Sequence, residues 1–256
     1  MLIPNHLLPI VDGKYFKQGL GFQDLQDKYC QLPMQPLQIT GHLINGYIPS
    51  SSNGAVHLDG ILSSAVFAAH PCFYRMPHNP TIVPLPLQAL WQSDDGVILY
   101  ASSDFVPDEQ HKGQEYWHKR YPADKNEWVR DKKLNSKGVW VEDPHQMNAK
   151  TTAGRYKDYR VPVDVRIANN LSAICIGNQA EIERLLSFVT HVGKKSSQGF
   201  GRIAKWEIKP ISATVNDVIA NRPVPVESQL KAEGKLRHAT WTSPYWFMGW
   251  AKECYV

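Results

Sequence analysis

The chain has few cysteines, and the four that it carries are scattered singly along 256 residues. They are Cys30, Cys72, Cys175 and Cys254, and no two of them form a C-x-x-C pair. Zinc sites and disulfide-stapled folds both need cysteines at close, regular spacings. The sequence therefore predicts no zinc site, no disulfide framework and a protein of the reducing cytoplasm.

Long apolar runs are absent too. No stretch approaches the roughly 18 residues that a bilayer-spanning helix requires. The start of the chain lacks a basic n-region, and prolines interrupt its apolar residues, so it does not read as a signal peptide. We expect no membrane partner, while the 43% hydrophobic content suffices for one elaborate domain or two small ones.

Several enzyme motifs are missing. The glycine-rich stretch GKKSSQGFGR, residues 193–202, follows a predicted helix and precedes a predicted strand, whereas Walker A and Rossmann loops lie between a strand and a helix. No G-x-S-x-G elbow of a hydrolase is present. His111 and His118 lack further ligands nearby, so no metal site is expected, and no cofactor is implied.

Charge is distributed unevenly along the chain. Residues 1–111 contain 4 Lys/Arg and 9 Asp/Glu, a balance of −5, whereas residues 112–256 contain 24 and 15, a balance of +9. The basic part also carries seven of the eight tryptophans. Cations together with flat aromatic side chains are typical of proteins that bind single-stranded nucleic acid. A solvated surface and tryptophans in a folded core remain the plainer alternative.

Apolar periodicity predicts six regular elements in the order strand, helix, strand, strand, helix, strand. They cover residues 37–44, 58–69, 96–103, 159–167, 178–192 and 202–211. The second helix has Asn178 at the N-cap position and Glu181 three residues later, as in a capping box. This order predicts an α+β fold of the ferredoxin-like (RRM-like) type.

The same pattern divides the chain into four parts. Residues 104–155 have few aliphatic side chains and many charges, so they are predicted to form an inserted, projecting segment. The other parts are a loop-rich lead-in, a core in two pieces and an irregular aromatic tail, over residues 1–35, 36–103 with 156–210, and 211–256.

The glycine-rich stretch is the strongest candidate for a binding site. Glycines allow close backbone approach, and exposed N–H groups beside lysines bind anions. We therefore expect it to grip RNA phosphates through Gly193, Lys194, Lys195, Ser196, Ser197, Gln198, Gly199, Phe200, Gly201 and Arg202. The alternative is a helix C-cap at Gly193 followed by a simple turn.

A second candidate lies before the third strand, where cations alternate with tyrosines. Its residues are Arg155, Tyr156, Lys157, Tyr159 and Arg160. This pattern suits contacts to phosphates and bases, although a solvated strand edge would look the same.

With a helix before it and a strand after it, the glycine-rich stretch resembles the G-x-x-x-x-x-G-x-G loop of the CRISPR-associated RAMP superfamily. Three more stretches make the resemblance specific to one type of subunit within the superfamily. They are LDGILSSAVF, AGRYKDYRVPV and RPVPVES…SPYWF. Together they resemble the Cas-five-type subunit of type IV CRISPR effector complexes, over roughly residues 37–250.

The resemblance implies a non-catalytic role in antiviral or anti-plasmid defence. Such subunits bind the 5′ handle of the guide RNA and cap one end of the backbone filament. The glycine-rich stretch would contact the handle, and residues 155–160 would lie at the base of a projecting thumb. Expected partners are the guide RNA, the backbone filament subunit, the large subunit and target DNA.

Two other functions stay open. Processing ribonucleases of the same superfamily use a histidine as general base near the first helix, where His57 and His42 lie. Asp59 stands two residues after His57, although such spacings are common by chance. A single-stranded nucleic-acid binder outside CRISPR systems would explain the charge and the aromatic residues, but not the order of helix, glycine-rich loop and strand.

Overall fold

A computed structural model places most of the chain. It describes residues 10–11, 14–15, 22–49, 55–70, 82–119, 132–134, 136–142, 158–231, 233–245 and 247–256. The chain divides into two compact units. One is formed by Met1–His111 together with Arg166–Val256, and the other by Lys112–Val165.

A four-stranded sheet with the order β10-β3-β9-β6 organises the first unit. Its strands are Gln35–Leu43 (β3), Val106–Lys119 (β6), Tyr159–Gly177 (β9) and Ile203–Pro210 (β10). β3 pairs antiparallel with both β10 and β9. The α+β class is thereby confirmed. The strand predicted at 96–103 is not in this sheet: β5, Ile98–Tyr100, pairs instead with β4, Ala89–Gln92.

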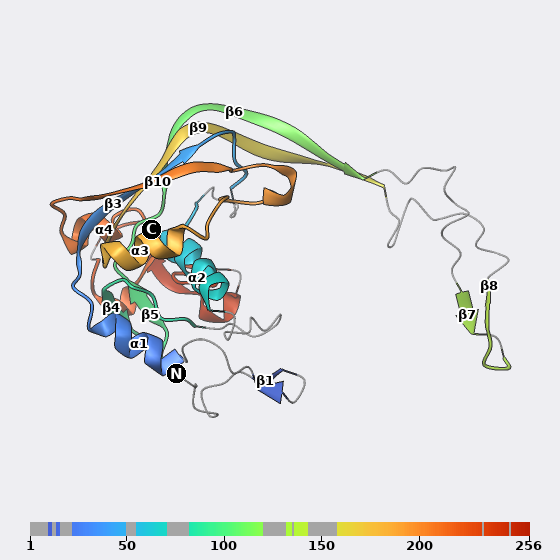
Figure 1. Cartoon of the computed structure of the whole chain (residues 1–256), viewed down its shortest axis with the longest axis horizontal. Helices are drawn as coiled ribbons and strands as arrows, with labels where there is room; N and C mark the ends of the chain where they lie inside the picture. Colours follow the sequence, from blue (N-terminus) through green and yellow to red (C-terminus); the bar gives the residue numbers. More distant parts are fainter. Residues whose placement is uncertain are drawn as a thin grey trace. The chain divides into compact units, whose positions relative to one another are not determined.

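Two helices pack against the sheet as the sequence predicted. α2, Leu58–Ala69, and α3, Gln179–Leu186, lie side by side on one face (Figure 1). Leu62 of α2, Leu185 of α3 and Leu37 and Leu171 of the strands are fully buried in one core. Their apolar stripes, read from the periodicity of the sequence, explain why both helices form here.

The lead-in contains a helix that the sequence pattern did not reveal. α1, Phe22–Cys30, buries Leu25 and Tyr29 in the main core. The Tyr29 hydroxyl and the Lys28 ammonium both donate to Glu181 Oε1 of α3, at 3.1 and 3.2 Å. A two-stranded hairpin, β1 (Ile10–Val11) with β2 (Lys14–Tyr15), precedes this helix. Residues 1–35 are therefore not only a loop.

The start of α3 confirms the predicted N-cap but not the complete capping box. Asn178 Oδ1 accepts a hydrogen bond from the Glu181 N–H at 3.0 Å. The Glu181 carboxylate does not reciprocate within the described residues; it accepts from Lys28, Tyr29 and Arg184 instead. Charge-assisted hydrogen bonds from Lys28 of α1 and from Arg184, one turn further along α3, thus occupy this carboxylate.

The predicted irregular tail is folded. It contains α4, Val215–Ile219, and a three-stranded sheet of the order β11-β13-β12. These strands are Val224–Pro225 (β11), Leu236–Ala239 (β12) and Lys252–Tyr255 (β13), with single 3-10 turns at Val226–Ser228 and Met248–Trp250. Trp241 and Cys254 join Val97 and Leu99 in a second core, and Trp250 packs against it, so these two aromatic residues of the tail pack on the body.

The described elements of the second unit are all strands. It includes the distal parts of β6 and β9 and a hairpin of β7, Lys132–Leu134, with β8, Trp140–Glu142. Its bounds, Lys112–Val165, overlap the insertion predicted at 104–155. Because Val106–Lys119 forms a sheet strand, the beginning of that stretch is more regular than its composition suggested.

Candidate nucleic-acid interface

The glycine-rich loop, here taken as residues 191–202, precedes β10, and hydrogen bonds hold it to the segment that follows β3. α3 ends at Leu186 and not at the predicted residue 192, so Gly193 is not a helix C-cap. Lys194 N–H donates to Ile48 O at 2.8 Å, and Gly201 N–H donates to Gly46 O at 2.9 Å. The Asn45 side chain contacts both ends of the loop tip: Nδ2 donates to Gly199 O, and Oδ1 accepts from Arg202 N–H. The loop is thus held in one conformation.

Two glycines of this loop cannot be replaced without moving the backbone. Gly193 and Gly201 have φ of +77° and +68°, in the left-handed region. A Cβ at Gly193 would lie 2.2 Å from Ile48 O, and one at Gly201 would lie 2.0 Å from Val192 O. The glycines therefore serve close backbone packing, as the sequence suggested, but against the chain's own backbone.

The outer side of the loop presents donors and positive charge. Lys194, Ser197 and Arg202 are exposed, as are Ser196, Gln198 and Gly199, whereas Lys195 and Phe200 are half-buried. Lys195 adopts a left-handed φ of +65° before a single 3-10 turn, Ser196–Gln198. Among the described residues, no acceptor pairs with the backbone N–H of Ser196, Ser197 or Phe200. Backbone N–H groups without an intramolecular acceptor, next to lysine side chains, favour the binding of an anion.

Positive charge is concentrated at the loop tip. The pKa of Lys195 is lowered by desolvation and by the neighbouring Lys194 ammonium. A nearby phosphate would relieve this repulsion, so the two lysines favour an anionic ligand. The loop is chemically suited to phosphate contacts.

The second predicted cluster is described only in part. Arg155, Tyr156 and Lys157 lie outside the described residues. Tyr159 and Arg160 belong to β9 in the second unit, where the Arg160 guanidinium lies 4.0 Å from the centre of the Tyr116 ring. Tyr159 meets Trp117 edge to face at 6.1 Å between ring centres. This ribbon carries exposed aromatic and cationic side chains from two strands.

The candidate histidines have different surroundings. His57, just before α2, pairs through Nδ1 with Asp104 Oδ1 at 2.5 Å, and its ring stacks on Tyr245 at 3.6 Å. His42 lies on β3, where Nε2 is 3.4 Å from Glu207 Oε2 of β10. A histidine held by a carboxylate can act as a general base. Both histidines lie beside a carboxylate, and His57 has the shorter contact to its partner.

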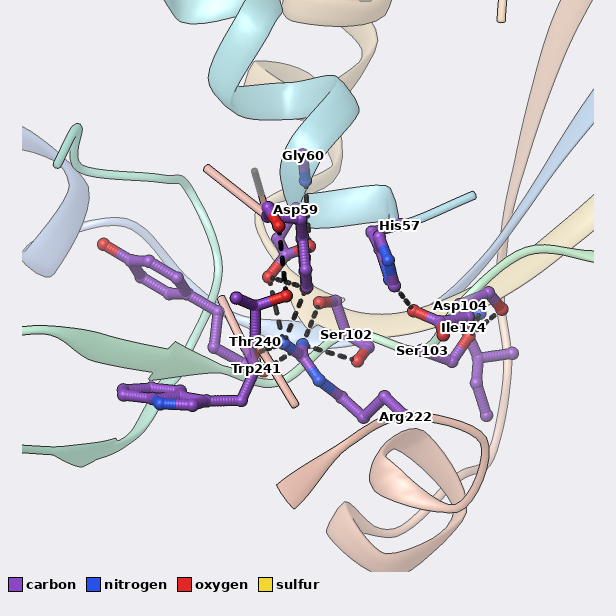
Figure 2. Close-up of polar contacts among 12 residues, drawn as sticks. His57, Asp59, Gly60, Ser102, Ser103, Asp104, Ile174, Arg222, Thr240 and Trp241 are labelled. Atoms are coloured by element: carbon purple, nitrogen blue, oxygen red, sulfur yellow. Dashed lines mark hydrogen bonds and ion pairs between the residues drawn. The ribbon is translucent and has the colours of Figure 1, made fainter. Parts of the chain in front are cut away.

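Asp59, the residue that the sequence paired with His57, does not contact it. Figure 2 shows its carboxylate directed toward the buried Arg222, with a 3.0 Å ion pair. Tyr245 donates to the same carboxylate at 2.8 Å, and burial raises the pKa of Tyr245 well above its usual range. Burial alone would lower the pKa of Arg222, but Tyr245, Asp59 and Asp104 raise it, so the guanidinium stays charged. This network is structural.

A cleft of about 910 Å³ opens beside the loop in the first unit. α2 lines one wall, residues 188–193 and Ser196 a second, and the C-terminal region a third, with Arg237 and His238 of β12 and Tyr245. His57 and His191 also line it. The sequence pattern pointed to His57 but to neither Arg237 nor His238, because β12 is distant along the chain from both the loop and α2.

The described residues contain neither a cluster of metal ligands nor a membrane-spanning helix. Within the part of the chain that the structure describes, no group of three or more His, Cys, Asp and Glu residues could hold a metal ion. None of the helices formed by those residues is long and apolar enough to cross a membrane. The glycine-rich loop and the cleft are therefore the two candidate binding sites for which a ligand has to be identified.

The chain matches a known protein family over most of its length. The model of the family described as CRISPR type IV associated protein Csf3 matches residues 35–254, which is most of the chain. The chain belongs to the Csf3 family. A search of curated proteins finds no match.

Membership of the Csf3 family confirms the type IV CRISPR part of the resemblance. The matched range includes the four central strands, α2, α3, the glycine-rich loop and nearly all the residues that line the cleft. The residues of α1 lie before it. The RAMP superfamily, the Cas-five-type role and the RNA contacts stay predictions.

Proposed function

We propose that this Csf3-family chain binds the 5′ handle of the guide RNA in a type IV CRISPR ribonucleoprotein. The observation that carries the proposal is the glycine-rich loop. Its backbone is fixed against residues 44–48, while it presents Lys194, Arg202 and three N–H groups that have no acceptor among the described residues. Such preorganised donors bind phosphates without the entropic cost of ordering a flexible loop.

The fold supports assignment to the RAMP superfamily and to its Cas-five-type members. The four strands of the central sheet and the two helices packed on it follow in the order β3, α2, β6, β9, α3, β10, with the β4–β5 pair between α2 and β6. In the sheet the strands lie in the order β10-β3-β9-β6. A β-α-β-β-α-β succession is that of the ferredoxin-like fold. In this assignment the glycine-rich loop occupies the helix-to-strand position that the superfamily uses for RNA.

We further propose that the chain caps one end of the backbone filament and contacts the large subunit, in a cytoplasmic complex active against viruses or plasmids. The second unit, with Tyr116, Trp117, Tyr159 and Arg160, is the counterpart of the thumb that would lie between RNA and the next subunit. Target DNA would approach near this filament end.

Binding is proposed to occur without turnover, and an endoribonuclease is the second candidate. The His57–Asp104 pair beside the cleft favours it. In that reaction Nε2 of His57, whose Nδ1 is paired with Asp104, would accept the proton of a ribose 2′-hydroxyl while the 2′-oxygen attacks the adjacent phosphorus. The P–O5′ bond breaks, and the leaving 5′-oxygen takes a proton from water. The products would be a 2′,3′-cyclic phosphate and a 5′-hydroxyl end, and no metal is needed.

The test uses purified protein and labelled repeat-derived RNA, with and without a mature 5′ handle, in EDTA across a salt series. We expect intact RNA and handle-dependent binding that the Lys194/Lys195/Arg202→Ala variant loses. Since each neutralised phosphate of a single strand contributes about −0.7 to the log–log salt slope, this variant should reduce the slope by about 2.

The matched control removes equal charge elsewhere. Lys205, Lys209 and Lys235 are exposed and lie outside the loop, so their triple alanine variant should bind nearly as wild type does. Equal losses in both variants would point to diffuse electrostatic attraction and contradict handle recognition by the loop. Cutting of the repeat that His57→Gln abolishes would replace the proposal with the ribonuclease.

A further inference from the structure

We propose that the cleft formed by α2, residues 188–196 and the C-terminal strand region binds one or two nucleotides of single-stranded RNA through Phe188 and Arg237. The inference deepens the proposed function and rests on it for the class of ligand. It adds a binding subsite for a base and its phosphate, separate from the phosphate contacts of the glycine-rich loop.

The electrostatics of the cleft favour an anion. Its ionisable lining side chains include Arg237 and the histidines His57, His191 and His238, and no Asp or Glu of the described residues lines it. Lys194 and Lys195 follow directly on the lining residue Gly193. Arg237 is thus the one charged side chain among these described lining residues, and with no carboxylate beside it in the lining it favours a ligand of negative charge.

The apolar part of the lining suits a base. Phe188 is 49% exposed and Met248 is 65% exposed, and both line the cleft. Exposed large apolar side chains at a concave, positively charged site are typical of surfaces on which bases stack. The hydroxyls of Ser64 and Thr240 donate to Gly60 O and Tyr245 O, so toward a ligand they can act only as acceptors, for a ribose hydroxyl or a base N–H.

The dimensions fit a nucleotide rather than a flat surface contact. Small-molecule sites measure about 300–1,000 Å³, and this cleft has a volume of about 910 Å³. The α2 wall is formed partly by Gly60, Ser64 and Ala68, whose small side chains leave this space open.

Continuity with the loop selects RNA over a separate metabolite. Gly193 and Ser196 line the cleft, and the Ser196 N–H is one of the loop donors without an acceptor among the described residues. A strand whose phosphates bind the loop could therefore place an adjoining base in the cleft. An acidic peptide of a partner subunit would satisfy the charge but not the need for a stacking partner at Phe188.

The experiment measures the binding of the fluorescein-labelled tetranucleotide rU4 by anisotropy, alongside the full handle RNA. Phe188, Arg237 and the control positions Lys235 and Leu236 are all exposed, so alanine variants keep the fold. We expect Phe188→Ala to weaken rU4 binding about tenfold, because base stacking contributes roughly 1–3 kcal/mol. Arg237→Ala should weaken it about three- to tenfold and lower the salt slope by about 0.7.

Lys235→Ala and Leu236→Ala are matched controls for charge and for apolar surface, since neither residue lines the cleft. They should bind rU4 as wild type does. A 4-thiouridine in the tetranucleotide should cross-link to residues 188–196 or 237–248.

The binding data distinguish a wrong assignment of the cleft subsite from a wrong assignment of handle recognition by the loop. Unchanged rU4 binding in Phe188→Ala and Arg237→Ala, or no rU4 binding at all, overturns the cleft subsite even when the loop still binds the handle. Conversely, cleft-dependent rU4 binding with no preference for the handle supports the subsite and overturns handle recognition.

Discussion

Arg222 connects three segments of the first unit through one fully buried guanidinium. Its Nη1 donates to Tyr100 O and to the backbone and side chain of Ser102, and its Nη2 donates to Asp59, Trp241 O and the Tyr245 hydroxyl. These contacts join the start of α2 to the strand region around residue 100 and to the C-terminal region (Figure 2). Charge-assisted hydrogen bonds therefore hold together the start of α2 and the C-terminal region, which both contribute residues to the cleft.

Replacing Arg222 should have a large effect on stability. Arg222→Met leaves the Asp59 carboxylate buried without its cation, which costs about 3–5 kcal/mol of unfolding free energy. Urea denaturation followed by circular dichroism measures the loss. The double variant Asp59→Leu/Arg222→Met should recover part of it, because the buried ion pair is removed as a whole. A single-variant loss below about 1 kcal/mol would show that the network does not stabilise the fold.

At the scale of elements, the loop between α3 and β10 depends on backbone contacts more than on its side chains. His191 and Arg202 form an isolated bridge at its base, and Ile48 and Lys194 form another. Asn45 closes the tip. The loop is thus an extension of the sheet edge, and its cations are displayed on a rigid support.

Alanine substitutions at Gly201 and Gly199 test which of these two glycines the fold of the loop requires. Gly201→Ala should cost at least about 2 kcal/mol, because a left-handed alanine costs roughly 1–2 kcal/mol and its Cβ would collide with Val192 O. Gly199→Ala should cost only about 1 kcal/mol, since no described atom lies within 4 Å of its Cβ position. Urea denaturation and handle binding are measured together; equal losses of stability would contradict the close approach of the Gly201 backbone to Val192.

At the scale of the whole molecule, one cluster joins α1, α2 and α3. Glu181 accepts from Lys28, Tyr29 and Arg184, and Arg184 also lies 3.3 Å from His70 Nε2, just after α2. Burial raises the pKa of Glu181, but hydrogen bonds from Arg184 and Lys28 outweigh it and hold that pKa below its usual range. Burial and the Arg184 charge also lower the pKa of His70.

The cluster makes stability depend on pH. Because the pKa of Glu181 is lower in the folded state, its contribution is complete above about pH 4.5 and is lost as pH falls through the folded value. Glu181→Gln should therefore destabilise the protein by about 1.5–3 kcal/mol at pH 7. The gap from wild type should narrow below about pH 4.5. Urea titrations between about pH 7 and 3.5 measure both; a gap independent of pH would contradict the coupling.

Much of this organisation could be predicted from the sequence. Helices α2 and α3 follow from apolar stripes, the N-cap from Asn178, and β3 and β10 from alternation. The segment of α1 was missed because only Leu25 and Tyr29 of its described side chains are buried, too few to give a clear period. The tail sheet was missed because its strands have two to four residues each.

The sequence by itself determined the α+β class, the glycine-rich loop and its cations, because these depend on local periodicity and on residues adjacent in the chain. Tertiary structure alone decided which distant groups meet. It paired Asp59 with Arg222 and His57 with Asp104, and it brought Phe188 and Arg237 to one cleft. The two hydrogen-bonded pairs are 47 and 163 positions apart along the chain, and Phe188 and Arg237 are 49 positions apart, so no local pattern encodes them.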